Sequence, residues 1–240
     1  MLKIKNDGES ASIYISGDIV DDADGDALET WGVDKGYQWP DGIRQQLEDI
    51  GDKDLTVYIN SDGGSVPAGV AIANMISRHK GHTTCIVDGW ACSIATQIFF
   101  AADERKIPAN AYLMIHKPST VAAGNADDLM EAVEALDTIQ QGLESTYNKA
   151  AREGVTPEQV HEMVENTTWL TGEEASKLFN VDVLEASKTA AKAGNAVKAF
   201  NSIPEAIKFK DDEQKPVIDK NKSAKRLALA IAITEGELYK

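Results

Sequence analysis

The stretch TTCIVDGWACSIATQIFF (residues 83–100) has the pattern of a strand that turns into a helix at a corner of small residues. Its first seven residues are rich in the β-branched and apolar types that favour strands. From Ile94 onward it is apolar enough for a buried helix. Ser93 lies at the corner, where a serine usually caps the helix and is a nucleophile only if a base activates it. The role of Ser93 therefore depends on the rest of the chain.

The chain around this stretch alternates between strands and helices. Further strands are predicted from β-branched and aromatic residues at residues 12–20, 55–59 and 111–116. Helices are predicted at residues 41–50, from Pro67 to a terminating Gly81, from Asp127, from Pro157 behind the N-cap Thr156, and behind the capping box Thr171–Glu174. The polar residues 21–40 predict a loop. This alternation predicts an α/β fold with a parallel sheet covered by helices.

Charge and hydrophobicity exclude two classes of protein. The net charge is −15, and residues 186–240 hold 11 Lys and Arg against 7 Asp and Glu, which leaves −19 on residues 1–185. So acidic a body argues against DNA or RNA as the main ligand. The chain also lacks a run of about 18 apolar residues, which a membrane-spanning helix would need.

The length and the two ends predict one domain with a tail in the cytoplasm. The N-terminal MLKIKNDGES lacks the apolar core of a signal peptide, and two cysteines do not make a disulfide framework. A chain of 240 residues buries one substantial core, which we assign to residues 1–186. The looser residues 187–240 are predicted to be a linker and a C-terminal tail that contacts a partner or is processed.

Three predicted strands each carry a chemically suggestive residue at their carboxyl ends. The Gly63–Gly64 turn follows the strand at 55–59, Ser93 follows the next one, and His116 closes the third. Because the carboxyl ends of parallel strands meet at one edge of a sheet, we expect these groups to lie together. His116 would take the proton of Ser93 as general base. Backbone N–H groups of the glycine turn and of Ile94 would form an oxyanion hole.

Four blocks of the sequence resemble one family. INSDGGSV, DGWACSIAT, LMIHKP and TTWLTGEEASKLF resemble the proteolytic subunit of the Clp protease in order and spacing, over roughly residues 12–185. The signature TWLTGEEA is most similar to the phage branch, the prohead or head maturation proteases. The resemblance implies a crotonase-like fold of stacked ββα units and a Ser-His-acid peptidase. It assigns the nucleophile to Ser93, the base to His116 and the oxyanion donors to Gly64 and Ile94.

The resemblance also implies how the protein acts and assembles. The long predicted helix with the apolar stripe Leu129–Tyr147 corresponds to the protruding helix through which rings of this family interlock. Homo-oligomeric rings acting on protein or peptide substrates, among them phage capsid or scaffold proteins, are therefore expected. No cofactor, metal or membrane contact is implied, and an AAA+ ATPase partner is not inferred.

The third catalytic position departs from the family pattern. The acid of the family falls two residues before the tryptophan of TTWLTGEEA, which here is Thr167. Threonine accepts a hydrogen bond from an imidazole but does not supply a full negative charge. Asn166 or Glu165 takes the place if the loop is shifted, so the third position stays open at this point.

Other residues of the chain and two other functions bear on this interpretation. His79 and His82 are interpreted as favourable charges near a helix end rather than as a zinc pair, because no further ligands cluster nearby. Cys92 is interpreted as a small buried residue rather than as the nucleophile. Two rival functions remain: a crotonase-type acyl-CoA enzyme on the same fold, and a non-catalytic structural subunit.

Overall fold

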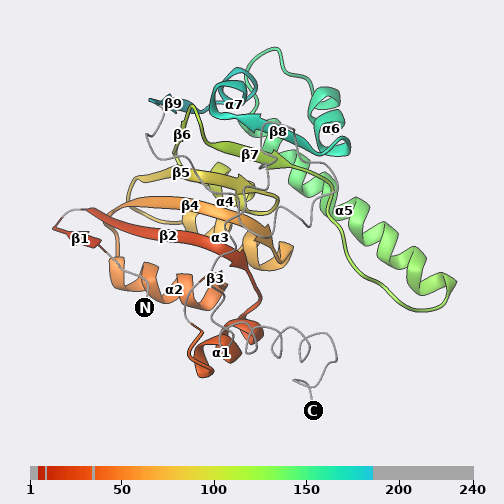
Figure 1. The fold of residues 1–240 in the computed structure, drawn as a ribbon, viewed down its shortest axis with the longest axis horizontal. Helices are drawn as coiled ribbons and strands as arrows, with labels where there is room; N and C mark the ends of the chain where they lie inside the picture. Colours follow the sequence, from red (N-terminus) through yellow and green to blue (C-terminus); the bar gives the residue numbers. More distant parts are fainter. Residues whose placement is uncertain (1–4, 9, 34–35, 186–240) are drawn as a thin grey trace, which may run out of the picture. The chain divides into compact units, whose positions relative to one another are not determined.

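A computed structural model of the chain describes residues 5–8, 10–33 and 36–185 (Figure 1). The tail predicted at residues 187–240 lies outside this part of the chain, so its prediction is not tested. Within the described residues, no helix combines the length and the apolar character that crossing a bilayer requires.

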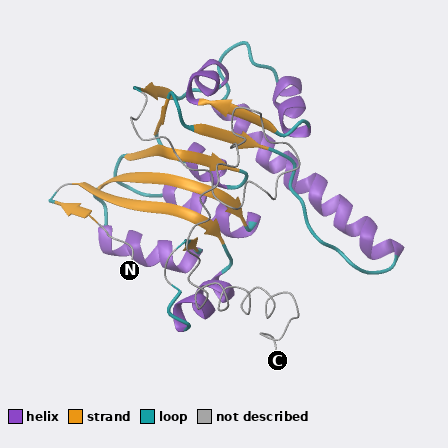
Figure 2. Ribbon diagram, viewed as in Figure 1, coloured by secondary structure: helices purple, strands orange, loops and turns teal. Residues whose placement is uncertain are grey.

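A mostly parallel sheet forms the centre of the described chain (Figure 2). Its main path runs in the order β1-β2-β4-β5-β6-β9, with β3 beside β2, β7 beside β5 and β8 beside β7. Only the pairs β1–β2 and β7–β8 are antiparallel among the strands described. The strands are β1 (Lys5–Asp7), β2 (Ser10–Ile19), β3 (Tyr37–Gln38), β4 (Asp54–Gly64), β5 (Thr83–Cys92), β6 (Glu104–Pro108), β7 (Tyr112–Ile115), β8 (Thr168–Thr171) and β9 (Asp182–Leu184).

Helices pack around this sheet and against one another. They are α1 (Asp22–Thr30), α2 (Pro40–Ile50), α3 (Val66–Ser77), α4 (Ala95–Phe100), α5 (Ala126–Ala150), α6 (Pro157–Glu165) and α7 (Gly172–Leu178). The short α4 contacts β4 and β5, and α3 packs between α2 and α4. In β4 the core side chains Leu55, Val57 and Ile59 are buried while the residues between them are more exposed, so one face of the strand builds the core. Figure 1 shows α5 reaching beyond the sheet.

The predicted strands are confirmed, and two of them are longer than expected. β4 continues through the predicted turn to Gly64, and β5 continues through the predicted corner to Cys92. The extra residues stay in the sheet because they find pairing partners: Gly64 pairs with Ile19 and Cys92 with Met114. Gly64 thus ends β4, and Ser93 and His116 directly follow the last residues of β5 and β7.

The loop predicted for residues 21–40 was wrong. It contains α1 and β3, although the sequence of α1 has little apolar periodicity. Tertiary packing stabilises this helix, because Leu28 is buried and Gly25 lies so close to the Trp39 ring that a Cβ there would be 2.3 Å from it. Acidic residues in its first turn also stabilise the helix by interacting with the positive end of its dipole.

Two further details of the helix predictions were wrong. α3 ends at Ser77 and not at Gly81, whose lack of a Cβ instead allows close contact with the Lys53 carbonyl. The helix expected from Ile94 stops at Phe100, and residues 104–108 form β6 between β5 and β9. Helices α5, α6 and α7 are confirmed; α6 and α7 have the expected caps, each with a complete capping box.

Candidate active site

Ser93 occupies a strained turn between β5 and α4. Its φ of 55° lies in the left-handed region, and α4 begins only at Ala95. Ser93 is therefore not the N-cap of α4, a position that Ile94 takes. Its N–H donates to the Met114 carbonyl at 2.8 Å, which continues the β5–β7 pairing by one residue. A sharp strand-to-helix turn of this kind is typical of nucleophilic serines.

His116 lies within hydrogen-bond distance of Ser93. Because Cys92 and Met114 pair in parallel β5 and β7, the chain brings Ser93 and His116 to the same end of adjacent strands. His116 Nε2 is 2.7 Å from Ser93 Oγ, which is the contact a nucleophile and its general base require. Burial lowers the pKa of His116, so its ring is neutral and able to accept a proton at pH 7.

Gly63 approaches Ser93 more closely than any side chain would permit. A Cβ built on Gly63 would lie 2.7 Å from Ser93 Cβ, 2.8 Å from the Cys92 carbonyl oxygen and 3.3 Å from the Ile94 nitrogen. Its φ of 97° also favours glycine. Gly64, the residue singled out from the sequence, pairs with Ile19 at the end of β4, and a Cβ on it would meet the Ile19 carbonyl; its backbone N–H stays the predicted oxyanion donor. The close approach by Gly63 brings the glycine turn and the Ile94 N–H to the same side of Ser93.

The register of β7 and β8 directs Thr167 toward the end of the sheet that carries His116. Ile115 pairs with Thr168 in antiparallel β7 and β8, so the next residues in that register are His116 and Thr167. Thr167 has a φ of 51°, which is a strained conformation for a β-branched residue. Thr167 thus lies just beyond the last residue pair of these two strands, as His116 does, and its part as the third catalytic residue stays a prediction.

The two alternatives for the third position, Glu165 and Asn166, have different surroundings. Glu165 forms an ion pair with Lys117 at 2.8 Å and accepts a hydrogen bond from Gln140 at 3.1 Å. The Lys117 contact lowers the pKa of the Glu165 carboxyl. Asn166 lines a hollow of about 330 Å³ between α6, β8 and α7.

Cys92 is a buried thiol rather than a second nucleophile. It is 0% exposed, and burial raises its pKa well above the ordinary value. A thiol that stays protonated is a poor nucleophile. This confirms the prediction that Cys92 fills space, here in a small cluster with Trp90 and Met114.

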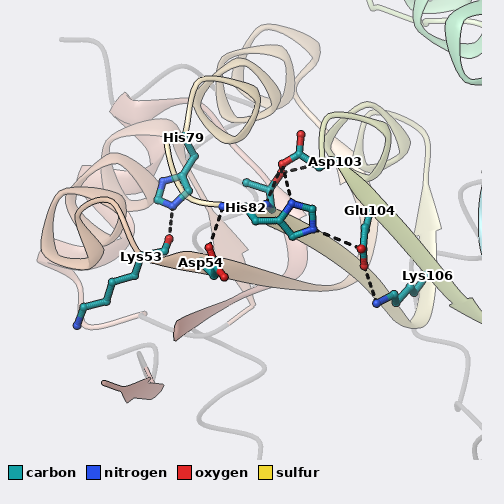
Figure 3. Close-up of polar contacts among 8 residues, drawn as sticks. Lys53, Asp54, His79, His82, Asp103, Glu104 and Lys106 are labelled. Atoms are coloured by element: carbon teal, nitrogen blue, oxygen red, sulfur yellow. Dashed lines mark hydrogen bonds and ion pairs between the residues drawn. The ribbon is translucent and has the colours of Figure 1, made fainter. Parts of the chain in front are cut away.

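His79 and His82 do not converge on a common point (Figure 3). His79 Nε2 lies 2.6 Å from the Lys53 carbonyl oxygen, whereas the His82 ring faces Asp103 at 3.7 Å and Glu104 at 3.4 Å. Among the residues described, no three His, Cys, Asp or Glu side chains are grouped as metal ligands would be. His79 and His82 therefore contact different protein groups.

One contributor to the site could not be recognised in the sequence. Thr96 Oγ1 donates a 2.6 Å hydrogen bond to the Ser93 carbonyl and lies 2.6 Å from the Tyr147 hydroxyl. The only sequence signal was a polar residue within an apolar helix, three residues after the candidate nucleophile.

Comparisons with known proteins agree with this geometry. Residues 45–184 match the family model described as Clp protease. An ATP-dependent Clp protease proteolytic subunit from Streptococcus gordonii is 34% identical over 139 residues, covering 56% of this chain and 70% of the relative. One from Streptococcus pneumoniae is 32% identical over 141 residues, covering 57% and 71%.

A solved structure shows the same fold. A mutant of ClpP1 from Listeria monocytogenes superimposes with a TM-score of 0.58 at 24% identity, covering 72% of this chain and 91% of that one. The fold is therefore ClpP-like: an α/β, crotonase-like arrangement of stacked ββα units with a protruding long helix. With the match to the family model over more than half of its length, this chain belongs to the Clp protease family and is a serine-type peptidase.

Proposed function

We propose that the protein is a serine endopeptidase whose nucleophile is Ser93 and whose general base is His116. The observation that supports this most is the 2.7 Å contact between Ser93 Oγ and His116 Nε2 at a turn that holds the serine in a left-handed conformation. Family membership gives the reaction class, and this contact supports Ser93 as the nucleophile and His116 as the base. Strained backbone conformations like that of Ser93 cluster at functional sites, which also supports the proposal.

The proposed reaction proceeds through an acyl-enzyme. Ser93 Oγ attacks the carbonyl carbon of a peptide bond while His116 Nε2 accepts the hydroxyl proton. The backbone N–H groups of Ile94 and Gly64 stabilise the oxyanion of the tetrahedral intermediate. The protonated His116 then donates its proton to the leaving amine. Water, activated by the same histidine, hydrolyses the ester and restores Ser93.

Thr167 takes the third position as an uncharged orienting group. Its hydroxyl accepts an N–H bond but carries no charge to stabilise the imidazolium that forms during the reaction. Ser93 and His116 then catalyse the reaction as a pair, and His116 is a weaker general base than a histidine assisted by an aspartate. We therefore propose a slow peptidase whose activity is set by the Ser93–His116 contact.

We further propose that the chain assembles into homo-oligomeric rings that enclose the site. α5 is 25 residues long and exposes apolar side chains in its first half: Leu129 is 43%, Met130 62% and Val133 54% exposed. Such a group of apolar residues on a helix surface is typical of a protein contact. A second copy of the chain is the proposed partner.

The proposed substrates are proteins of a phage head, cleaved in the cytoplasm of a bacterial host. The support is the resemblance of TWLTGEEA to the phage branch, and the structure shows this segment as β8 and the start of α7 beside the site. The family match ends at residue 184. This supports a peptidase domain at residues 1–186 followed by a separate segment at residues 187–240.

Loss of the nucleophile should abolish peptidase activity. We expect Ser93→Ala to lower the rate of cleavage of an unfolded protein substrate by at least about 10²-fold, because triad removal costs roughly 10⁶-fold in another serine protease and roughly 10⁴-fold of that belongs to the acid. The matched control is Ser176→Ala on α7, whose hydroxyl contacts only the Glu173 carbonyl among the contacts described. Cleavage followed by gel and by mass spectrometry measures both variants.

The same experiment separates the rival functions. A Ser93→Ala variant that cleaves as fast as Ser176→Ala would contradict the assignment of the nucleophile. An intact assembly that cleaves nothing would favour the non-catalytic subunit, a rival that Thr167 makes relevant. Binding of coenzyme A without cleavage would favour the acyl-CoA enzyme.

A further inference from the structure

The carbonyl of Ser93 is held by a neighbour on α4. Two donors of Thr96 reach it, the N–H at 3.0 Å and Oγ1 at 2.6 Å. On its other side the Ser93 N–H is held by the Met114 carbonyl. A non-glycine residue in the left-handed region persists only where surrounding contacts over-determine it. These three hydrogen bonds fix the left-handed conformation of Ser93, because they hold both its N–H and its carbonyl.

The Thr96 hydroxyl is itself oriented by α5. Thr96 Oγ1 lies 2.6 Å from the Tyr147 hydroxyl. A threonine hydroxyl has one proton, and Thr96 donates it to the Ser93 carbonyl, so Tyr147 is the donor in the second bond. Burial raises the pKa of Tyr147, which keeps this donor protonated. The two bonds form a directed chain from Tyr147 through Thr96 to Ser93.

These hydrogen bonds are buried, and packing fixes the position of the Tyr147 ring. Thr96 is 0% and Tyr147 1% exposed. The Tyr147 ring packs against Phe100 at 5.9 Å and Phe179 at 6.4 Å between ring centroids. A second bond, from Gln97 Nε2 to the Leu143 carbonyl at 3.3 Å, also ties α4 to α5. The Tyr147 hydroxyl therefore has little freedom to leave Thr96.

We propose that Thr96 and Tyr147 are positioning residues for the nucleophile. The chain Tyr147 OH–Thr96 Oγ1–Ser93 O holds Ser93 in the turn that aims its Oγ at His116. This inference rests on the proposed role of Ser93. A purely structural role of the same bonds would affect the stability of the fold and leave the reactivity of Ser93 unchanged.

The test compares hydroxyl-deleting variants with a hydroxyl-keeping one in the full-length chain. Thr96→Val preserves the shape and removes the hydroxyl, Thr96→Ser keeps it, and Tyr147→Phe keeps the ring. Thr138→Val is the matched control, since it removes an exposed hydroxyl from α5 that bonds only the Glu134 carbonyl among the contacts described. The readouts are the rate of Ser93 labelling by a fluorophosphonate, kcat and KM for a peptide, and the melting temperature.

We expect Thr96→Val to lower both the labelling rate and kcat about tenfold at unchanged KM, the scale of one buried hydrogen bond. Tyr147→Phe should lower them about threefold, because the Thr96 bond to Ser93 remains. Thr96→Ser and Thr138→Val should retain the rates of the unaltered chain. If Thr96→Val does not fold, Tyr147→Phe compared with Thr138→Val decides the question.

Two results would overturn the inference, and they are distinguishable. Labelling and kcat of Thr96→Val and Tyr147→Phe at the control level, with only a lower melting temperature, would assign these residues a structural role alone. No labelling and no cleavage by the unaltered, assembled chain would overturn the proposed function and this inference with it.

Discussion

Thr167→Asp should raise kcat/KM for peptide cleavage by about 10²- to 10⁴-fold, since replacing the acid by an amide in another serine protease lowers kcat by about 10⁴. The register that pairs Ile115 with Thr168 directs residue 167 toward the end of the sheet that carries His116. A carboxylate there would stabilise the imidazolium that forms when Ser93 loses its proton. Aspartate also tolerates the φ of 51° better than the β-branched threonine does.

Thr167→Asn is the matched control for this prediction. Asparagine has nearly the size of aspartate and the same tolerance of the left-handed region, but it has no charge. We expect its kcat/KM to stay near that of the unaltered chain. Steady-state cleavage of a fluorogenic peptide measures all three proteins. Equal rates for the Asp and Asn variants would show that a charge at residue 167 does not act on His116.

Gly63→Ala should lower the rate of Ser93 acylation by at least about 10²-fold, the cost of displacing a reacting group by about 1 Å. The added Cβ would meet Ser93 Cβ at 2.7 Å and the Cys92 carbonyl oxygen at 2.8 Å, so one of the two strand ends must move. The φ of 97° adds backbone strain. Stopped-flow measurement of the acylation burst with an activated ester would give the rate.

Gly142→Ala provides the comparison. Gly142 lies on α5 with an ordinary φ and no atom within 4 Å of an added Cβ. This substitution should leave acylation unchanged, and the alanine should slightly stabilise the helix. A folded Gly63→Ala variant with the acylation rate of Gly142→Ala would contradict the account of how the glycine turn approaches the nucleophile.

The existence of the strands, and the residues that follow them, could be predicted because both follow from local patterns. Runs of β-branched, aromatic and other apolar residues located β2, β4, β5 and β7, and the rule for carboxyl ends of parallel strands brought Ser93 and His116 to one edge. The structure adds the 2.7 Å contact between them. Capping residues likewise located the starts of α6 and α7, since a cap is a short-range interaction.

Features that depend on tertiary contacts could not be predicted. α1 lacks helical periodicity and is stabilised by the fit of Trp39 against Gly25. The left-handed turn at Ser93 arises because strand pairing continues to Met114 before the chain enters α4. Which of the two glycines approaches Ser93 depends on how far β4 pairs with β2, and this selects Gly63. Each of these features depends on contacts with residues that are distant in the sequence.

The central claim is that Ser93 is a nucleophile activated by His116. Intact-mass spectrometry after incubation with a fluorophosphonate tests it on the unaltered chain, on Ser93→Ala and on His116→Ala. We predict one adduct on the unaltered chain, none on Ser93→Ala and much slower labelling of His116→Ala. An adduct that persists in Ser93→Ala, or equal labelling rates with and without His116, would contradict the claim.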